Sequence, residues 1–280
     1  MFKKTLKLAS LLLLLVFSFI YTEKVFSKAR ESDPVMKEVL KLKKENDIKP
    51  KEPTILDDEL ILGISGLTIN EKESYKKMKE NDKFDEDKIV YETKLPKNSI
   101  SKTYEYYIKQ GNPSLKKVSI IFKVKDNDNL DNLLSLIAKE DITASFFIDG
   151  VWLEENIETA FSINNLGLEI YNLGYNGTYL KNMITTTNNL IESITLKDSN
   201  YCLNDEKNDE QKNICLDRKM HTIMSTIKNP SLKELKENLK KGAIISYDVS
   251  SFDESKLGII VNTITSRGYD ITSLNNLLKE

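Results

Sequence analysis

The sequence predicts an α/β fold with parallel strands over residues 117–280. Short apolar runs such as "KVSIIFKV" and "TASFFIDG" have the length and composition of buried strands. Amphipathic stretches separate these runs, and strands that alternate with helices pair in parallel through right-handed crossovers. Periodicity leaves two architectures open, a (β/α) barrel and an open doubly wound sheet.

The elements expected in this region alternate along the chain. Strands are expected at residues 117–124, 143–150, 168–171, 220–226, 242–249 and 269–272. Helices are expected at residues 130–140, 153–166, 255–268 and 273–280, with a further helix that ends at Thr195. Glycines close two of these helices at Gly167 and Gly268, because glycine adopts the left-handed conformation that ends a helix.

The composition excludes one class of partner. Of 280 residues, 40% are hydrophobic and 30% are charged, and the net charge is −2. The chain therefore has enough apolar residues for a substantial core, and it has no basic excess with which to offset nucleic-acid phosphates.

Three segments precede the predicted α/β region. Residues 1–24 combine a basic start with the apolar run "LASLLLLLVFSFIY", which is typical of a signal peptide or an uncleaved signal anchor. Either would place the rest of the chain on the extracytoplasmic side. Residues 25–58 are expected to be a charged stalk or linker with a helix that starts at Pro34, and residues 59–112 a small α+β module.

Cys202 and Cys215 flank the charged segment "LNDEKNDEQKNI". In an extracytoplasmic protein they are candidates for a disulfide bond, worth about 3 kcal/mol for a loop of this length. The alternative is a pair of buried thiols. A metal site is not expected, because the spacing is long and no second cysteine pair or histidine stands nearby.

The segment 172–177, "NLGYNG", has the composition of a turn after a strand, since Gly and Asn tolerate positive φ. In α/β folds, loops that follow the carboxyl ends of strands contain the catalytic and ligand-binding residues. Yet this loop contains no His, Cys, Asp, Ser or Lys.

Several segments, in order and with fitting spacing, resemble the polysaccharide deacetylase family, also called the NodB homology domain. They are "KVSIIFKVKDN", "ITASFFIDGVWLEEN", the frame G-x-E-I-x-N from Gly167 to Asn172, "LKKGAIISYDV" and "RGYDITSLNNLL". The resemblance implies a distorted (β/α) barrel of about seven strands over 117–280. It also implies removal of acetyl groups from glycans by water bound to a divalent metal such as zinc.

The residues that such chemistry requires are replaced at every motif. By the resemblance, the catalytic base and a metal-binding Asp fall on Lys123 and Val124, and the two metal-binding histidines on Leu173 and Gly177. The histidine that acts as the catalytic acid in the family falls near Asp248, toward the C-terminal end of the resemblance. The chain contains a single histidine, His221, which is expected to be a packed or edge residue near the start of a strand. We therefore expect no catalytic residues, no bound metal and no cofactor.

These observations favour an inactive, deacetylase-like protein of a bacterial cell envelope that binds a cell-wall glycan or an envelope protein. Candidate ligand contacts, from the resemblance and from position, are Asp149, Trp152, Asn172, Tyr175, Asn176 and Tyr179. One alternative is an active deacetylase that uses Lys123 with Asp126, or Asp149 with Asp248. A second is a scaffold that pairs with a membrane protein complex through its stalk.

Overall fold

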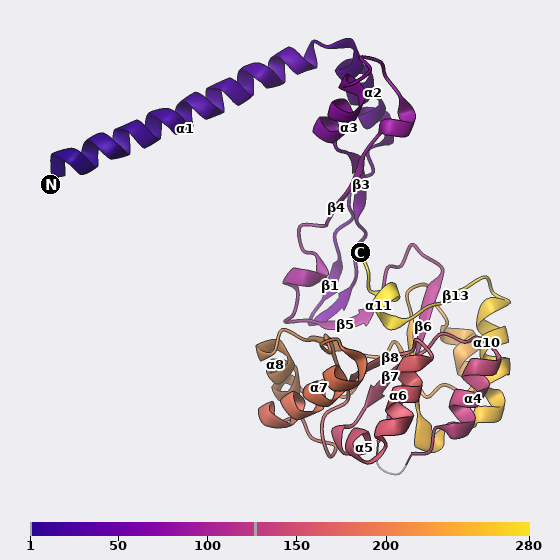
Figure 1. The fold of residues 1–280 in the computed structure, drawn as a ribbon. Coiled ribbons are helices and arrows are strands. Elements are labelled where there is room, and N and C mark those ends of the chain that lie inside the picture. Colours follow the sequence, from indigo (N-terminus) through magenta and orange to yellow (C-terminus); the bar gives the residue numbers. More distant parts are fainter. Residues whose placement is uncertain (1, 126–127) are drawn as a thin grey trace. The chain divides into compact units, whose positions relative to one another are not determined.

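The computed structural model describes residues 2–125 and 128–280. The chain divides into two compact units (Figure 1): one comprises residues up to Pro50 and Ser65–Lys94, the other Lys51–Ile64 and Leu95–Glu280. Residues 59–112, expected to be one module, are thus shared between the two units. Their local pattern shows short strands, but it does not show with which distant strands these pair.

The first unit is small. Its elements are α1 (Phe2–Glu31), α2 (Pro34–Asn46), β3 (Gly66–Ile69), α3 (Glu71–Lys79), the 3-10 turn η1 (Glu86–Lys88) and β4 (Tyr91–Lys94), and β3 and β4 form an antiparallel hairpin. Asp33 caps α2 ahead of Pro34, and Asn70 caps α3. No helix within the described residues, α1 included, combines the length and the apolarity that crossing a membrane requires.

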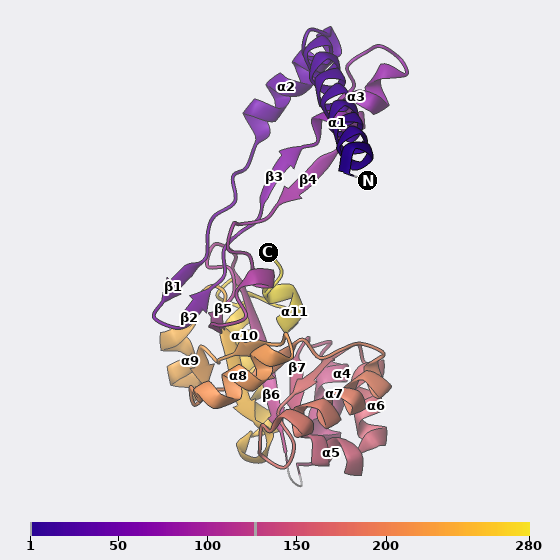
Figure 2. The same cartoon turned by 90° about the vertical axis from the view of Figure 1, so that its left-hand side faces the viewer.

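The second unit contains a curled sheet wrapped by helices (Figure 2). Among the described residues this sheet has eleven strands: ten follow the order β1-β2-β5-β10-β9-β8-β7-β6-β12-β11, and β13 pairs with β6. The strands are β1 (Thr54–Leu56), β2 (Glu59–Ile61), β5 (Tyr107–Gln110), β6 (Lys117–Val124), β7 (Ser145–Ile148), β8 (Glu169–Asn172), β9 (Tyr201–Leu203), β10 (His221–Ile223), β11 (Ile227–Lys228), β12 (Ile244–Asp248) and β13 (Asp270–Ile271). Apart from the antiparallel pair β1–β2, all these strands pair in parallel.

The sheet confirms the predicted α/β class, and its curvature agrees with a distorted barrel. Strands β6 to β12 form its central part, and β1, β2 and β5 from the preceding segment extend it. The sheet is incompletely closed, and Thr226 spans part of the gap. The Thr226 hydroxyl donates to the Lys109 carbonyl at 2.5 Å and accepts from the Ile244 amide at 2.9 Å.

The helices of this unit are short and lie between the strands in the chain. They are α4 (Asp131–Lys139), α5 (Gly150–Glu155), α6 (Ile157–Asn165), α7 (Lys181–Thr195), α8 (Asp209–Asp217), α9 (Leu232–Asn238), α10 (Leu257–Thr265) and α11 (Leu274–Leu277), with the 3-10 turns η2 (Ile100–Lys102), η3 (Val249–Ser251) and η4 (Glu254–Lys256). Ser231 begins α9 with a capping box, and Ser273 caps α11.

Two hydrophobic clusters follow the two faces of the sheet. Successive side chains of a strand point to opposite faces, so Val118, Ile120 and Phe122 of β6 join the cluster beneath the helices. Ile121 lies between them in sequence and joins the inner cluster, which α11 completes with Leu274 and Leu277. The inner cluster fills the interior of the barrel.

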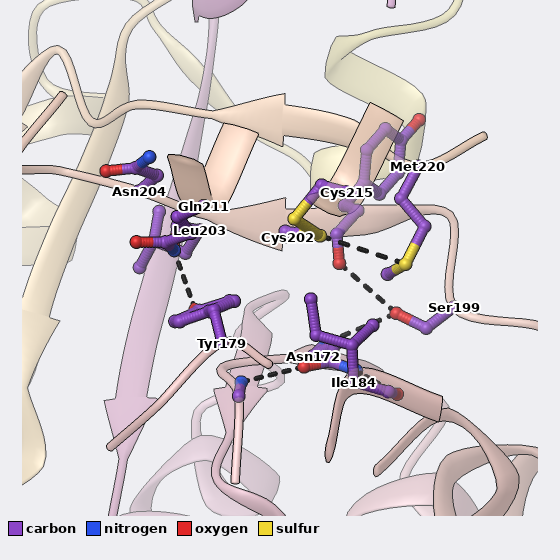
Figure 3. The surroundings of a disulfide bond; sticks show 12 residues. Asn172, Tyr179, Ile184, Ser199, Cys202, Leu203, Asn204, Gln211, Cys215 and Met220 are labelled. Atoms are coloured by element: carbon purple, nitrogen blue, oxygen red, sulfur yellow. Dashed lines mark hydrogen bonds between the residues drawn. A yellow bond between two sulfur atoms is a disulfide. The ribbon is translucent and has the colours of Figure 1, made fainter. Parts of the chain in front are cut away.

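Cys202 and Cys215 form a disulfide bond, which links β9 to α8 (Figure 3). Both cysteines are fully buried and pack with Ile184 of α7 and with Met220. The bond joins cysteines 13 residues apart in the sequence, and the segment that it closes runs from β9 into α8.

Breaking this disulfide is expected to lower the free energy of unfolding by about 3 kcal/mol, because the closed loop restricts the unfolded chain. The double variant Cys202→Ser/Cys215→Ser should show this loss in urea titrations without reductant. Wild-type protein treated with reductant should match the variant. Equal unfolding midpoints for wild type and variant would contradict the prediction.

Candidate functional site

The mouth of the barrel is the open end at the carboxyl ends of β6, β9 and β12, where an ion cluster joins three segments. The Lys123 ammonium lies 3.0 Å from the Asp248 carboxylate and 3.5 Å from the Asp205 carboxylate. Lys123 and Asp248 are register partners on neighbouring parallel strands. Lys123 lies two residues after the inward Ile121, and Asp248 lies four residues after the inward Ile244. Their side chains therefore enter the barrel interior above the inner cluster.

These three charges are largely withdrawn from solvent. The side chains of Lys123, Asp205 and Asp248 are 13%, 9% and 26% exposed. Burial would raise the pKa of Asp248, but hydrogen bonds from Asn229 and Lys123 outweigh burial and hold that pKa below its ordinary value. The other Asp205 oxygen accepts from the Ser225 amide at 2.7 Å.

The residues at the family's metal-binding positions do not fit a divalent metal. Val124 is fully buried among the residues that face the helices, and Leu173 packs against the inner cluster. Gly177 has no side chain that could bind an ion. Within residues 2–125 and 128–280, no group of three His, Cys, Asp or Glu side chains could hold a metal. The two carboxylates of the mouth already have a cation, the Lys123 ammonium.

The loop 172–177 has the backbone conformation that its composition predicts, with positive φ at Gly174, Asn176 and Gly177. Asp149 holds this loop in place and is 3% exposed. Its carboxylate accepts hydrogen bonds from the backbone amides of Val151, Asn176 and Gly177, at 2.9, 3.0 and 2.9 Å.

Asn172 has a comparable structural role and is fully buried. Its amide nitrogen donates to the Ile184 carbonyl at 3.0 Å and to Asn188 at 2.6 Å, and its side-chain oxygen accepts from the Gly174 amide at 2.7 Å. The polar atoms of Asp149 and Asn172 are thus engaged within the protein, and ligand contact by these two residues stays a prediction.

Trp152 departs from the expectation of a ligand contact. It is 1% exposed and belongs to the helix-covered cluster, and its indole nitrogen donates to the Asp128 carbonyl at 2.8 Å. A sugar ring cannot stack on an indole that is buried in this way.

The remaining candidates lie nearer the surface. Asn176 is exposed, and Tyr175 and Tyr179 are half-buried. The Tyr175 hydroxyl donates to Glu154 at 2.8 Å, and this bond to a carboxylate raises the pKa of Tyr175. The Tyr179 hydroxyl donates to the Leu203 carbonyl at 2.8 Å (Figure 3). Ligand contact by these three residues stays a prediction.

The comparisons with known proteins agree with this geometry. No family model matches the chain. The uncharacterized protein YlxY of Bacillus subtilis (strain 168) is 27% identical in an alignment of 273 positions, which covers 89% of this chain and 84% of YlxY. The crystal structure of BA3943, described as a CE4 family pseudoenzyme from Bacillus anthracis, has a TM-score of 0.67 at 24% identity, covering 89% of this chain and 96% of its own.

A structure described as a deacetylase matches a smaller share of the chain. The Bc1960 peptidoglycan N-acetylglucosamine deacetylase has a TM-score of 0.55 at 15% identity and covers 61% of this chain and 92% of its own. The fold is that of the CE4 polysaccharide deacetylases. Within this fold, the mouth of the present chain contains an ion cluster where the resemblance places a metal-binding centre.

Two residues at the mouth of the barrel, Asp205 and Asn229, were not predicted from the sequence to belong to the site. Asp205 follows β9, a strand of three residues that is too short to show a period. The resemblance gave no sign of Asp205, because the Arg and prolines of the family motif expected near residues 200–205 are absent from "NYCLND". Of the pairs suggested for an unusual enzyme, Asp126 lies outside the described residues, and the Asp149 carboxylate binds the loop amides instead.

Proposed function

We propose that this chain is an extracytoplasmic, catalytically inactive protein of the CE4 fold that binds cell-wall glycan. The observation that carries the proposal is the Lys123 ammonium between the Asp205 and Asp248 carboxylates. Deacetylation of an amide needs an electrophile that polarises the carbonyl and a base that activates water. The mouth offers an ion-paired lysine in place of both.

Three further observations support it. The similar structure BA3943 is described as a pseudoenzyme, and a mutant of BA3943 as one with restored enzymatic activity. Bc1960 is described as acting on peptidoglycan. The Cys202–Cys215 disulfide is typical of proteins that fold in an oxidising compartment.

Metal analysis and an acetate-release assay on the same preparation test the proposal that the protein is catalytically inactive. We expect well under one equivalent of zinc or another transition metal per chain and no acetate from N-acetylated peptidoglycan, while the protein still sediments with insoluble peptidoglycan. A CE4 deacetylase such as Bc1960, assayed in parallel, is the positive control.

One equivalent of tightly bound metal, with acetate release that a chelator abolishes, would replace the proposal with an active enzyme. Absence of metal, activity and sedimentation together would leave an inactive protein whose partner is another envelope protein.

A further inference from the structure

The amino ends of β8, β9 and β10 lie side by side at the end of the barrel opposite the mouth, and two pockets adjoin there. One, of about 580 Å³, is lined by residues that include Glu169, Tyr171 and Lys197. The other, of about 520 Å³, is lined by residues that include Tyr104 and His221. Asn200, Tyr201 and Asn275 line both pockets, so the two adjoin, and together they are here called the base groove.

A row of four rings lies at the floor of the base groove, where Tyr171, Tyr201 and His221 are buried at 8%, 6% and 6% exposure. Tyr104 stacks on His221 with ring centroids 4.0 Å apart and planes at 9°. Tyr201 follows at 6.1 Å from His221, and Tyr171 packs edge-on against Tyr201 at 5.0 Å. Tyr104 is half-buried, so part of its ring remains accessible. The row runs from one pocket into the other.

His221 begins β10, as the sequence predicts, and is 6% exposed. Burial lowers the pKa of His221 to about 4, so the imidazole is neutral at neutral pH. Its Nδ1 has no hydrogen-bond partner in the part of the chain that the structure describes.

The rim of the groove is polar and balanced in charge. Asn200, Asn275 and Asn276 are exposed at the shared boundary and beside it. The lysines of the lining are Lys197, Lys219 and Lys279, and its acids are Asp198, Glu169 and Glu280. Such a rim favours an uncharged ligand with many hydroxyl and amide groups over an anion.

We propose that the base groove binds two or more consecutive sugars of an N-acetylated amino-sugar chain, and that it is the glycan-binding surface of this protein. The accessible part of the Tyr104 ring would pack on the apolar face of a sugar, and the exposed side-chain amides of Asn200 and Asn275 would bond hydroxyl and acetamido groups. Two adjoining pockets match a repeating ligand, and their volumes lie in the range of ligand sites. The proposal rests on the proposed function for the nature of the polymer, and it assigns binding to the end of the barrel opposite the mouth.

Titration of the full chain with chitotetraose, followed by calorimetry or NMR, tests the proposal. Asn200→Ala, Asn275→Ala and Tyr104→Ala are each expected to weaken binding about three- to tenfold, the range expected for one lost stacking or hydrogen-bond contact. Tyr175→Ala and Asn176→Ala alter comparable side chains at the mouth and test the alternative binding site. The matched controls are Tyr91→Ala and Asn182→Ala, at exposed positions outside both sites, and they should bind as the wild type does. Asn200 and Asn275 are exposed, so these two variants test the groove even if Tyr104→Ala fails to fold.

The outcomes separate this inference from the proposed function. If the mouth variants weaken binding and the groove variants do not, the base groove is excluded while glycan binding stands. If every groove variant binds chitotetraose as tightly as the wild type does, the base groove is also excluded as the binding site. If the wild type binds neither chitotetraose nor peptidoglycan, the groove proposal and the glycan-binding part of the proposed function both fall, and catalytic inactivity is unaffected.

Discussion

Replacing Lys123 with alanine is expected to destabilise the barrel by about 2–4 kcal/mol at neutral pH. The change leaves the Asp205 and Asp248 carboxylates at the mouth without their cation, and an uncompensated charge in a mostly buried site is costly. The lower end of the range allows for the partial exposure of Asp248. Urea or thermal unfolding followed by circular dichroism measures the loss.

Lys139→Ala is the matched control, since Lys139 is 75% exposed and its pairing with Glu140 spans 3.9 Å. We expect a change below about 0.5 kcal/mol there. If the two lysine variants were equally stable, the carboxylates of the mouth would be hydrated well enough to do without the ammonium.

The destabilisation should depend on pH with a defined sign. The pKa of Asp248 is held below its ordinary value of 3.8 in the folded protein, so its ion pair stabilises the fold above that value. This stabilisation is lost as the pH falls through the lowered folded pKa. The difference in unfolding free energy between wild type and Lys123→Ala should therefore be constant from about pH 5 to 7 and should shrink below about pH 4.

Replacing Asp149 with alanine is expected to cost about 2–4 kcal/mol, because three backbone amides lose their acceptor together. The loop 172–177 should also become mobile, with faster hydrogen exchange at Asn176 and Gly177. Unfolding titrations and exchange mass spectrometry would measure the two effects.

Asp253→Ala is a suitable comparison, because the exposed Asp253 carboxylate accepts from one backbone amide, that of Ser255. A single exposed cap is worth about 1 kcal/mol. If Asp149→Ala cost no more than Asp253→Ala and left exchange in the loop unchanged, Asp149 would be an ordinary helix cap.

The elements predicted correctly are those whose pattern is local. "KVSIIFKV" is long and apolar enough to be β6, and the glycines and asparagines of the loop 172–177 adopt the positive φ that their chemistry allows. Gly167 and Gly268 also adopt positive φ, just beyond α6 and α10. These features depend on neighbouring residues and need no knowledge of the rest of the chain.

The elements that were missed depend on distant partners. β2 pairs with β5, although Ser65–Lys94 of the first unit lies between them in the sequence. No periodicity in the sequence encodes that pairing. The ion cluster brings together residues 123, 205 and 248, and the sequence shows only that each follows or ends an apolar run. Trp152 was a candidate ligand contact because of its place after a strand, whereas it lies in α5 and is packed in the helix-covered cluster at 1% exposure.

The discontinuous origin of the sheet bears on how this protein can be dissected. A truncated chain that begins at Leu95 would lack Leu60 and Leu62 of the inner cluster and would uncover the edge of β5. An unprotected parallel strand with apolar neighbours is a route to aggregation. The two stretches Lys51–Ile64 and Leu95–Glu280, rejoined by a short linker in place of Ser65–Lys94, are therefore the minimal unit for expression.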